Sequence, residues 1–470
     1  MQALLLIIFI AHFAFGFQFF AVGTYGITAL EVAVLLFYCV FFAKVLRENC
    51  KFSIPRHALP AVLGVFIVSV ILSGVSLMTS FASAEIIQFF KTFIHLVFLM
   101  IITVLGVSYE FDKKLIDNIF KLWLILSLPI NIFGIYQIFA RAFDLPLAWL
   151  EYTNVTLALR GSTDSEDVVK QLSLQFGNFF RATSVFSEPS ALAAFNLNVF
   201  TLCIIPYVQK AKPLIKSKIL LISIFVFCVA GLFLTFSLTG VLGCVLILLS
   251  ILFLEAKKVR IRILKIIIAG IILLIPADLL IEDYTETSVF ELFSKRLTGI
   301  LGGNDRMASD GIDGESFATR AGAFGKSFDI WKTSPIFGVG IGLTQYNKEV
   351  DLNFSEFTIM AVLSELGIIG AVAFIAFFAL LFKIALQMRR YVARNALPDP
   401  SLARQYGVVY YLLLIQFEIN FITSNHLVAA NLWIHILLVL VPVANFLRQK
   451  YGAYTFTLFD KSFKDKYLRG

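Results

Sequence analysis

Long apolar runs recur along the chain and restrict its possible folds more than any other feature. Each run extends over about 18 residues, enough for a helix to cross the hydrocarbon core of a bilayer. A backbone inside lipid must satisfy its own polar groups, and a continuous apolar run does so as a helix. We therefore predict an all-α polytopic membrane protein with about 12 transmembrane helices in one transmembrane domain, residues 1–470. The expected spans are 3–22, 27–46, 58–78, 86–107, 115–140, 188–209, 217–236, 238–254, 262–281, 357–386, 405–423 and 427–447.

The composition supports a lipid environment and excludes several other classes of protein. Apolar residues make up 59% of the chain and charged residues only 15%, whereas soluble proteins are about a quarter charged. The 50 Phe and 15 Tyr residues suit lipid contact and interfacial belts. A nucleic-acid enzyme, a secreted disulfide scaffold and a disordered chain are excluded, and the five cysteines show no disulfide or zinc spacing.

The distribution of Lys and Arg among the loops predicts the orientation of the chain. The short loops 23–26, 79–85, 237 and 424–426 contain neither residue, whereas the loops on the opposite side and the C-terminal tail contain two to six each. Loops rich in Lys and Arg stay in the cytoplasm, so both termini should be cytoplasmic. We attribute the net charge of +8 to cytoplasmic loops that face anionic lipid, rather than to binding of nucleic acid. Met1–Ala21 lacks a basic start and a small-residue cleavage site, so we expect a retained first span.

Two long connections, 141–187 and 282–356, should then lie on the external side of the membrane. Long ordered loops in compact proteins are usually functional. The apolar spacing over 315–333 predicts an amphipathic helix within the second loop. Pro335 should end this helix, and the glycine-rich segment 338–342 should make a tight turn into the next span.

The first candidate site is Arg181, close to the point where the first long loop re-enters the membrane. Pro189 and Ser190 suit the start of a helix, whose N-terminus favours anions, and an arginine fork at a dry boundary matches a phosphate. An equally good interpretation is an interfacial arginine that reaches the headgroups or pairs with Glu188.

Arg320 and Lys326 are the cations of the predicted amphipathic helix. Taken alone, a solvated basic face of an interfacial helix explains them better than catalysis does. The 338–342 segment is not expected to be a nucleotide loop, because no strand precedes it and no Gly-Lys-Ser/Thr sequence follows it.

Two carboxylates belong to the span that follows the second long loop. Glu356 is placed at its external boundary, where a carboxylate near arginines suits a general base or a helix N-terminal charge. Glu365 lies deeper, and we expect it to hydrogen-bond within the bundle, as we do for Lys91, His95 and the polar residues 418–435. No spacing typical of a metal site occurs, so we expect neither a metal nor a cofactor.

Several of these motifs, in this order, resemble the bacterial family of O-antigen ligases and O-antigen or exopolysaccharide polymerases. The resemblance covers roughly residues 115–390. The motifs that carry it are Gly134-Ile-Tyr136-Gln137, Arg181 followed by Phe186-Ser-Glu188-Pro189-Ser190, Arg320 followed by Trp331 and Ser334-Pro335-Ile-Phe-Gly338-Val-Gly340-Ile-Gly342, and Leu363-Ser-Glu365-Leu-Gly367-Ile-Ile-Gly370.

The resemblance implies a glycosyltransferase of the GT-C-like helical type that uses a polyprenyl diphosphate. It implies that Arg181 and Arg320 hold the diphosphate of the donor lipid. Ligases of this family commonly carry a histidine nine residues before the Glu of the Glu-x-Gly motif, and here that position is Glu356, which favours a polymerase and makes Glu356 the expected base. The further substrate-binding residues that we expect are Arg160, Glu188, Lys326, Tyr136 and Gln137.

The resemblance therefore implies a metal-independent, inverting polymerase that moves a growing glycan from undecaprenyl diphosphate to a hydroxyl of another lipid-linked repeat unit. It would act at the external face of the bacterial inner membrane, with the lipid bilayer and a chain-length regulator as partners, and without nucleic acid. The alternatives are a ligase that delivers glycan to lipid A-core or to a protein hydroxyl, and a lipid-linked glycan transporter. Lys91 with His95 is the best support for the transporter.

Overall fold

The computed structural model describes most of the chain. The described residues are 2–12, 18–22, 25–48, 50–78, 83–153, 168–171, 173, 175–176, 179–255, 259–264, a few positions between 268 and 291, 317–344, 357–394, 399–423, 425 and 427–457. The chain groups into two compact units: unit 1 is Met1–Leu122, Thr153–Val168 and Lys326–Gly470, and unit 2 is Trp123–Tyr152 and Val169–Gly325.

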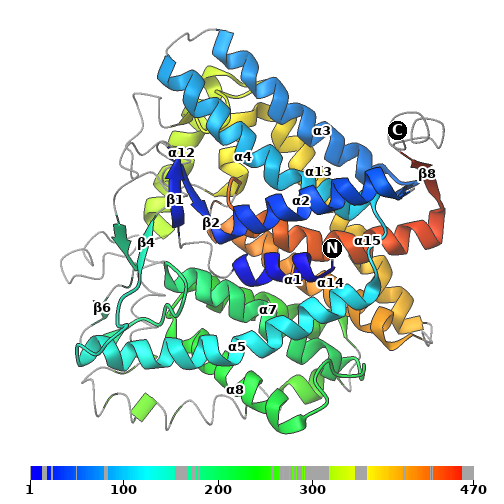
Figure 1. Ribbon diagram of the computed structural model, residues 1–470. Coiled ribbons are helices and arrows are strands. Elements are labelled where there is room, and N and C mark those ends of the chain that lie inside the picture. The colour runs from blue at the N-terminus through cyan, green and yellow to red at the C-terminus, as the bar shows by residue number, and fades with distance from the viewer. Residues whose placement is uncertain are drawn as a thin grey trace. The chain divides into compact units, whose positions relative to one another are not determined.

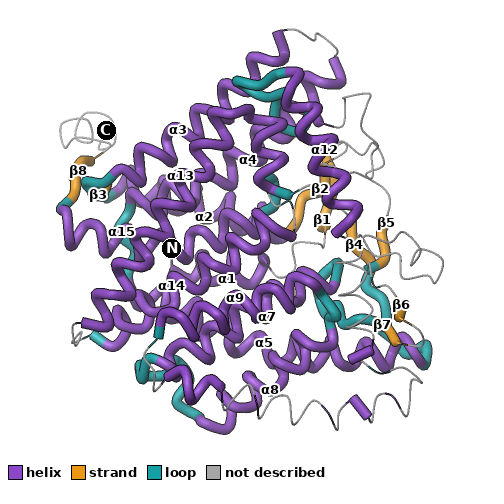
Figure 2. Tube along the Cα trace, turned by 180° about the vertical axis from the view of Figure 1, so that it is seen from behind, coloured by secondary structure: helices purple, strands orange, loops and turns teal. Residues whose placement is uncertain are grey.

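Unit 1 is a helical bundle in which α13 packs along α3 and α15 packs along α4 (Figures 1 and 2). The antiparallel pair of β3 and β8 links the N-terminal and the C-terminal part of this unit. Its elements are α1 (Gln2–Ala11), β1 (Gln18–Val22), β2 (Tyr25–Thr28), α2 (Ala29–Arg47), β3 (Lys51–Pro55), α3 (Ala58–Leu72), η2 (Ser73–Met78), α4 (Ser83–Ser108), α13 (Thr358–Arg394), α14 (Pro400–Glu418), η5 (Ile419–Thr423), α15 (Ala430–Tyr451) and β8 (Ala453–Thr457).

Unit 2 is built around α7, which packs against both α8 and α9. Two helices, α5 (Lys113–Ala142) and α12 (Phe317–Thr333), contain residues of both units. The other elements of this part are β4 (Glu151–Thr153), β5 (Val168–Lys170), β6 (Gln175–Phe176), β7 (Phe179–Phe180), α7 (Pro189–Val208), α8 (Lys218–Leu234) and α9 (Leu238–Leu254).

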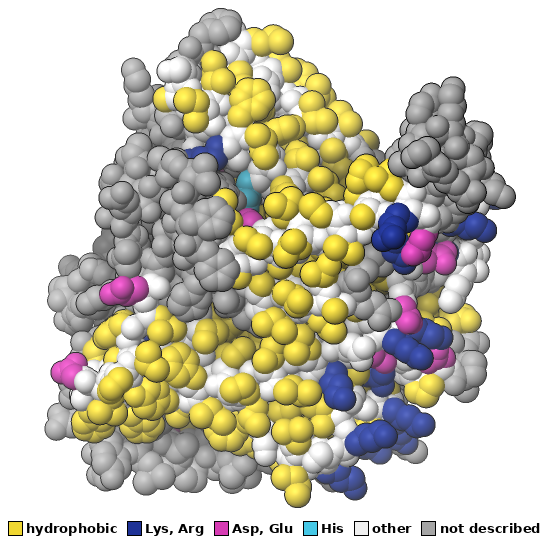
Figure 3. Space-filling model, in the orientation of Figure 1, with side chains coloured by type: hydrophobic (Ala, Val, Ile, Leu, Met, Phe, Trp, Pro, Cys, Tyr) yellow, Lys and Arg dark blue, Asp and Glu magenta, His cyan; other side chains and the backbone are white. Residues whose placement is uncertain are grey.

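The helices confirm an all-α polytopic membrane protein. Within the described residues, eight helices are long and apolar enough to cross a membrane, and α8 and α9 are shorter apolar helices. Most of α7 and α15 is buried, whereas α2 and α3 expose large apolar side chains such as Leu36 and Val68. Figure 3 shows such hydrophobic side chains over much of the visible face. Exposed apolar faces of this extent suit contact with lipid.

The expected span 3–22 differs from the structure. Helix α1 covers only Gln2–Ala11, and Gln18–Val22 forms a strand paired with Tyr25–Thr28. A short apolar run rich in aromatic and β-branched residues satisfies the pattern of a buried helix and that of a strand equally well. Most of the expected span 262–281 lies outside the described residues, so the number twelve stays a prediction.

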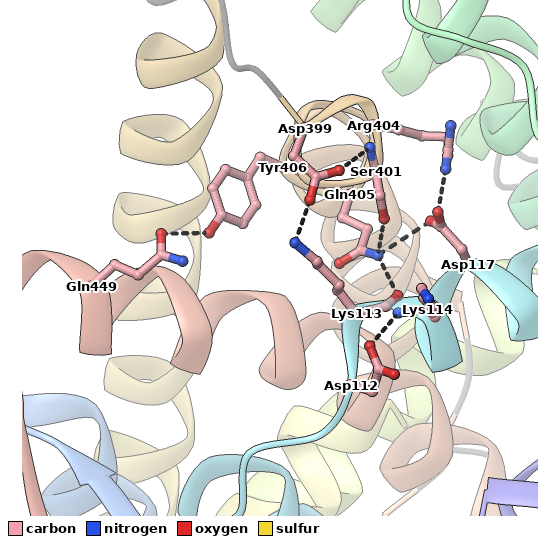
Figure 4. Close-up of polar contacts among 10 residues, drawn as sticks. All are labelled: Asp112, Lys113, Lys114, Asp117, Asp399, Ser401, Arg404, Gln405, Tyr406 and Gln449. Atoms are coloured by element: carbon pink, nitrogen blue, oxygen red, sulfur yellow. Dashed lines mark hydrogen bonds and ion pairs between the residues drawn. The ribbon is translucent and has the colours of Figure 1, made fainter.

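Polar contacts join the N-terminal end of α5 to the N-terminal end of α14 within unit 1 (Figure 4). Lys113 pairs with Asp399, and Arg404 pairs with Asp117. Asp399 also caps α14 by accepting from Ser401 N at 2.9 Å. The Lys113 ammonium, which donates to it, lowers the pKa of the Asp399 carboxyl. The connections that lead into α5 and α14 are on the side that the distribution of Lys and Arg predicts to be cytoplasmic.

Candidate functional site

Arg181 is buried in the segment that leads from β7 into α7. Its residue is 6% exposed, and its Nε donates to the main-chain oxygen of Thr235 at 2.8 Å, between α8 and α9. The N–H of Ala182 donates to the main-chain oxygen of Leu234 at 3.0 Å. These two bonds attach the Arg181 segment to the α8–α9 turn, so that a permanent cation is fixed in a dry environment at the helix ends.

A second arginine, Arg141 in the last turn of α5, supports the main chain at Arg181. Arg141 is 4% exposed, and its Nη1 donates to the main-chain oxygen of Arg181 at 2.7 Å. Its Nε donates to Ala148 O at 2.9 Å, and its Nη2 donates to Gln171 Oε1 at 2.9 Å and to Thr183 Oγ1 at 2.6 Å. Among the described residues, protein acceptors thus occupy at least four of its five N–H groups, and Arg141 acts as a structural support for the segment.

Gln171 is the second centre of this network. Its Oε1 accepts from Gln137 Nε2 at 3.0 Å and from Leu150 N at 3.1 Å, in addition to Arg141. Its Nε2 donates to the main-chain oxygens of Ser184 and Phe186, each at 2.7 Å. One buried amide therefore joins the end of α5, the following loop and the segment before α7. Buried polar networks of this kind hold their members in a single arrangement when all are satisfied.

Three of the residues predicted from the sequence lie in this part of unit 2. Gln137 is fully buried, and its Oε1 accepts from Thr183 Oγ1 at 3.1 Å, which places it in the Arg181 network. Tyr136 is 36% exposed and donates to Pro146 O at 2.6 Å. Glu188 is half-buried and precedes α7 as its N-cap residue. The predicted helix start at Pro189 is therefore confirmed.

The sequence analysis did not identify Arg141 or Gln171 as functional residues. A usable signal existed for Arg141, because it follows Gln137 by four residues and both therefore share one face of α5. A glutamine and an arginine on one face near the end of an apolar helix predict a buried polar network. Gln171 gives no such signal, since it lies between short strands without helical spacing.

The glycine-rich turn belongs to unit 1 and closes a break in α13. The break is at Gly367, whose φ is 67°. Within the turn, Val339 N donates to Ser364 O at 2.9 Å and Gly340 N donates to Glu365 O at 3.1 Å. Just after the break, Ile368 N donates to Pro335 O at 2.9 Å. The turn thus satisfies backbone groups that a break inside an apolar bundle would leave without partners.

Helix α12 confirms the expected helix over 315–333 within its described part, Phe317–Thr333. The helix ends at Thr333, before the predicted proline, and Trp331 Nε1 donates to Pro335 O at 2.9 Å across this end. Lys326 is exposed on α12. Arg320 belongs to the same helix, and its side chain lies outside the described residues.

Of the remaining predicted residues, some lie outside the described residues and others inside them. Arg160 and Glu356 lie outside the described residues, so their roles and the approach of Arg181 to Arg320 stay predictions. Glu365 is buried and accepts from Thr344 Oγ1 at 3.2 Å, as expected for a carboxylate that hydrogen-bonds within the bundle. Within the described ranges, no group of three or more His, Cys, Asp or Glu side chains is placed to hold a metal ion.

The intramembrane polar residues of unit 1 also make contacts between helices. His95 Nε2 lies 3.1 Å from Val428 O, and Thr358 Oγ1 donates to Asn420 Oδ1 at 2.8 Å. Such pairs agree with the expectation that these side chains hold helices together.

Part of the chain matches a known protein family. A family model described as O-antigen ligase (Wzy_C) matches residues 223–375, which include α8, α9, α12, the glycine-rich turn and the break in α13. No curated protein matches the chain. The family match confirms the resemblance that the motifs around Arg320 and Glu365 indicate.

Proposed function

We propose that this chain, which is related to the O-antigen ligases and polymerases, is an enzyme of the polymerase type. Its donor would be a glycan on undecaprenyl diphosphate, and its acceptor a hydroxyl of a second lipid-linked repeat unit. The family match supports an O-antigen ligase- or polymerase-type function in general. The choice of the polymerase rests on Glu356, which occupies the position of the ligase histidine in the motif.

One observation carries the catalytic part of the proposal: the fixed and buried guanidinium of Arg181. Its main-chain oxygen accepts from Arg141 and from Ser173 Oγ at 2.8 Å, and its Nε is held by Thr235. A cation that is already oriented and shielded from water stabilises a departing diphosphate without reorganisation at the moment of reaction. Arg320 is proposed to contribute the second cation from α12.

In the proposed reaction, the acceptor oxygen forms a bond to the anomeric carbon while the bond from that carbon to the diphosphate oxygen breaks. Attack from the opposite face inverts the configuration. The electron pair of the broken bond leaves with the diphosphate, whose charge Arg181 and Arg320 stabilise. Glu356 takes the proton of the acceptor hydroxyl, and a partly desolvated boundary would raise its basicity toward the range that general bases need.

The ligase remains the second candidate, because the matching family model is described as O-antigen ligase. Both reactions share the donor and the leaving group and differ only in the acceptor. Arg160, Glu188, Lys326, Tyr136 and Gln137 are proposed to bind or support the substrate in either case. A transporter would instead move an intact lipid-linked unit between leaflets.

The test uses the purified full-length chain with a lipid-diphosphate-linked repeat unit as the only substrate. A ladder of longer lipid-linked glycans, formed in the presence of EDTA and lost in Arg181→Ala and Arg320→Ala, supports the polymerase. Transfer only after addition of lipid A-core supports the ligase. A repeat unit that changes leaflet without chemical change supports a transporter and contradicts the enzymatic proposal.

A further inference from the structure

Segments of unit 1 that are far apart in the chain bring cations to one place beside the strand pair of β3 and β8. The register of this pair sets Ile54 opposite Tyr454, and Figure 2 shows the two strands side by side. Arg56 follows β3, and its main-chain N–H donates to Gly452 O at 3.1 Å. Lys450 belongs to the last turn of α15, directly before this point. The strand pair therefore holds Arg56 next to the end of α15.

Lys383 on α13 belongs to the same group of cations. His57, the N-cap residue of α3, has its pKa lowered by burial and then by the positive charges of Lys383 and Lys450. Both lysines are exposed, as is Arg56. Among the described residues, no carboxylate forms an ion pair with any of these three cations. Their positive potential is thus not cancelled by a neighbouring acid in the described chain.

Exposed aromatic rings lie against two of these cations. Arg56 Cζ is 4.7 Å from the ring centroid of Tyr454, which is 62% exposed. Lys450 Nζ is 5.0 Å from the ring centroid of Tyr451, which is 42% exposed. Stacking on a ring uses the face of a guanidinium, and no described acceptor takes a hydrogen bond from the Arg56 side chain. Its N–H groups therefore suit the oxygens of a phosphate.

The basic patch, defined as Arg56, Lys383, Lys450, Tyr451 and Tyr454, lies where apolar helices end. Helix α3 begins at residue 58 and α15 ends at residue 451, and both are long and apolar enough to cross a membrane. The ends of such helices lie at the depth of the lipid headgroups, where tyrosine and basic residues gather. The distribution of Lys and Arg predicts the cytoplasmic side for this end, and anionic lipids are abundant in that leaflet.

We propose that the basic patch is a binding site for the headgroup of an anionic phospholipid of the cytoplasmic leaflet. The Arg56 guanidinium and the Lys450 ammonium donate hydrogen bonds to the phosphate oxygens, and Lys383 adds positive charge. The rings of Tyr451 and Tyr454 pack beside the glycerol and the first acyl carbons. The site uses none of the residues proposed for catalysis and does not depend on the proposed reaction.

The alternative is a general attraction of anionic lipid to every basic loop on this side. Lys216 and Lys218, before and at the start of α8, provide the comparison. Both are exposed and belong to a loop with the same predicted orientation. Within the described ranges, neither of them lies over an aromatic ring. If charge alone attracts the lipid, removal of these two lysines should weaken binding as much as removal of two cations from the basic patch.

The experiment measures binding of phosphatidylglycerol to the full-length chain in detergent by native mass spectrometry. We expect Arg56→Ala and Lys450→Ala each to raise the dissociation constant about fivefold, the effect of one cation at an anionic surface. Lys216→Ala and Lys218→Ala should each change it by less than about twofold, because exposed charges away from the bound phosphate are screened. Tyr454→Phe should bind as the unchanged protein does, since the ring remains.

Folding of the variants is checked separately. Arg56→Gln and Lys450→Gln retain a long side chain without the charge and should weaken binding as the alanine variants do. The midpoint of thermal unfolding in phosphatidylcholine, whose headgroup has no net charge, should be the same for all variants and the unchanged protein. Phosphatidylglycerol should raise this midpoint in the unchanged protein and in the Lys216 and Lys218 variants, and raise it less in the Arg56 and Lys450 variants.

Three results would overturn the proposal. The first is unchanged affinity for phosphatidylglycerol in both Arg56→Ala and Lys450→Ala. The second is an equal loss in the double variants Lys216→Ala/Lys218→Ala and Arg56→Ala/Lys450→Ala, which would show a general attraction to basic loops. The third is displacement of the lipid by inorganic phosphate at the concentration of the lipid, which would show a site for free phosphate. None of these results affects the proposed function, which the glycan ladder tests.

Discussion

Arg141 Nη1 donates to the main-chain oxygen of Arg181 at 2.7 Å, so one arginine holds the backbone of another. The two side chains differ in what they contact. Arg141 is occupied by protein acceptors and lies over the ring of Trp149, 4.3 Å from the ring centroid. Arg181 is anchored to the α8–α9 turn. In the proposed reaction, Arg141 would act through the position of Arg181.

Replacing Arg141 by Ala should destabilise the protein and the Arg181 segment together. The change leaves several buried acceptors without donors, and removing one partner of a buried charged network typically costs about 3–5 kcal/mol. We expect a lower midpoint of thermal unfolding in detergent and loss of donor binding. Arg141→Lys should recover part of the stability but little of the binding, because an ammonium cannot reproduce the planar fork.

Arg260→Ala is the control for the Arg141 variant. The Arg260 guanidinium is exposed and donates to the main-chain oxygens of Glu255 and Phe253, so its removal should change stability by no more than about 0.5 kcal/mol. If Arg141→Ala unfolds at the same temperature as Arg260→Ala, the supporting role of Arg141 is wrong.

Gly367→Ala and Gly338→Ala should each destabilise unit 1. Both glycines have positive φ, and a Cβ on either one would lie 2.2 Å from main-chain atoms of the facing segment. The left-handed conformation alone costs about 1–2 kcal/mol for another residue, and backbone atoms cannot move aside cheaply. We expect a reduced yield of monodisperse protein and a lower unfolding temperature by fluorescence.

Gly325→Ala is the matched control on α12. A Cβ at Gly325 meets nothing within 4 Å, and alanine favours a helix by roughly 0.5–1 kcal/mol. This variant should be as stable as the unchanged protein or more so. Equal behaviour of all three alanine variants would contradict the close approach of the turn to the break in α13.

Acid should weaken the start of α3 through His57. Its Nδ1 accepts from Leu59 N at 3.2 Å, which requires the neutral ring. Burial, helped by Lys383 and Lys450, lowers the pKa of His57 below its usual value of about 6.5. The folded state therefore binds the proton less readily than the unfolded chain, so the cap contributes fully above about pH 6.5 and is lost as the pH falls through the lowered pKa.

His57→Asn tests this dependence, because asparagine caps helices without titrating. The unfolding midpoints of the two proteins should agree within the effect of a cap, about 1 kcal/mol, at pH 7.5. The variant should become relatively more stable as the pH is lowered toward 5. Parallel pH profiles would show that His57 does not titrate with folding.

Glu356→Gln should remove the proposed general base while retaining size and polarity. We expect kcat for glycan extension to fall by roughly 10²–10⁴, with a smaller change in donor affinity. Lys326→Ala provides the comparison on the exposed surface of α12 and should act on KM more than on kcat. Full activity of Glu356→Gln under conditions where chemistry limits the rate would assign the proton to another group.

Much of the helical pattern could be predicted because it depends on local sequence. The hairpin expected at 217–236 and 238–254 is present as α8 and α9, and the helix ending before Pro335 is present as α12. Apolar length, a proline at a helix start and glycines in a turn each act over a few residues. The 3–22 segment was predicted less well, since its apolar character suits a strand as readily as a helix.

By itself, the sequence determined that this chain belongs in a membrane, where most of its helices begin and end, and which cations merit attention. Only the tertiary structure decided that Arg141 and Ser173 hold the backbone of Arg181, and that the 338–342 turn closes the break at Gly367. The physical reason is distance along the chain. Buried hydrogen bonds between residues 30 to 40 positions apart depend on how the helices pack, and no local spacing encodes that packing.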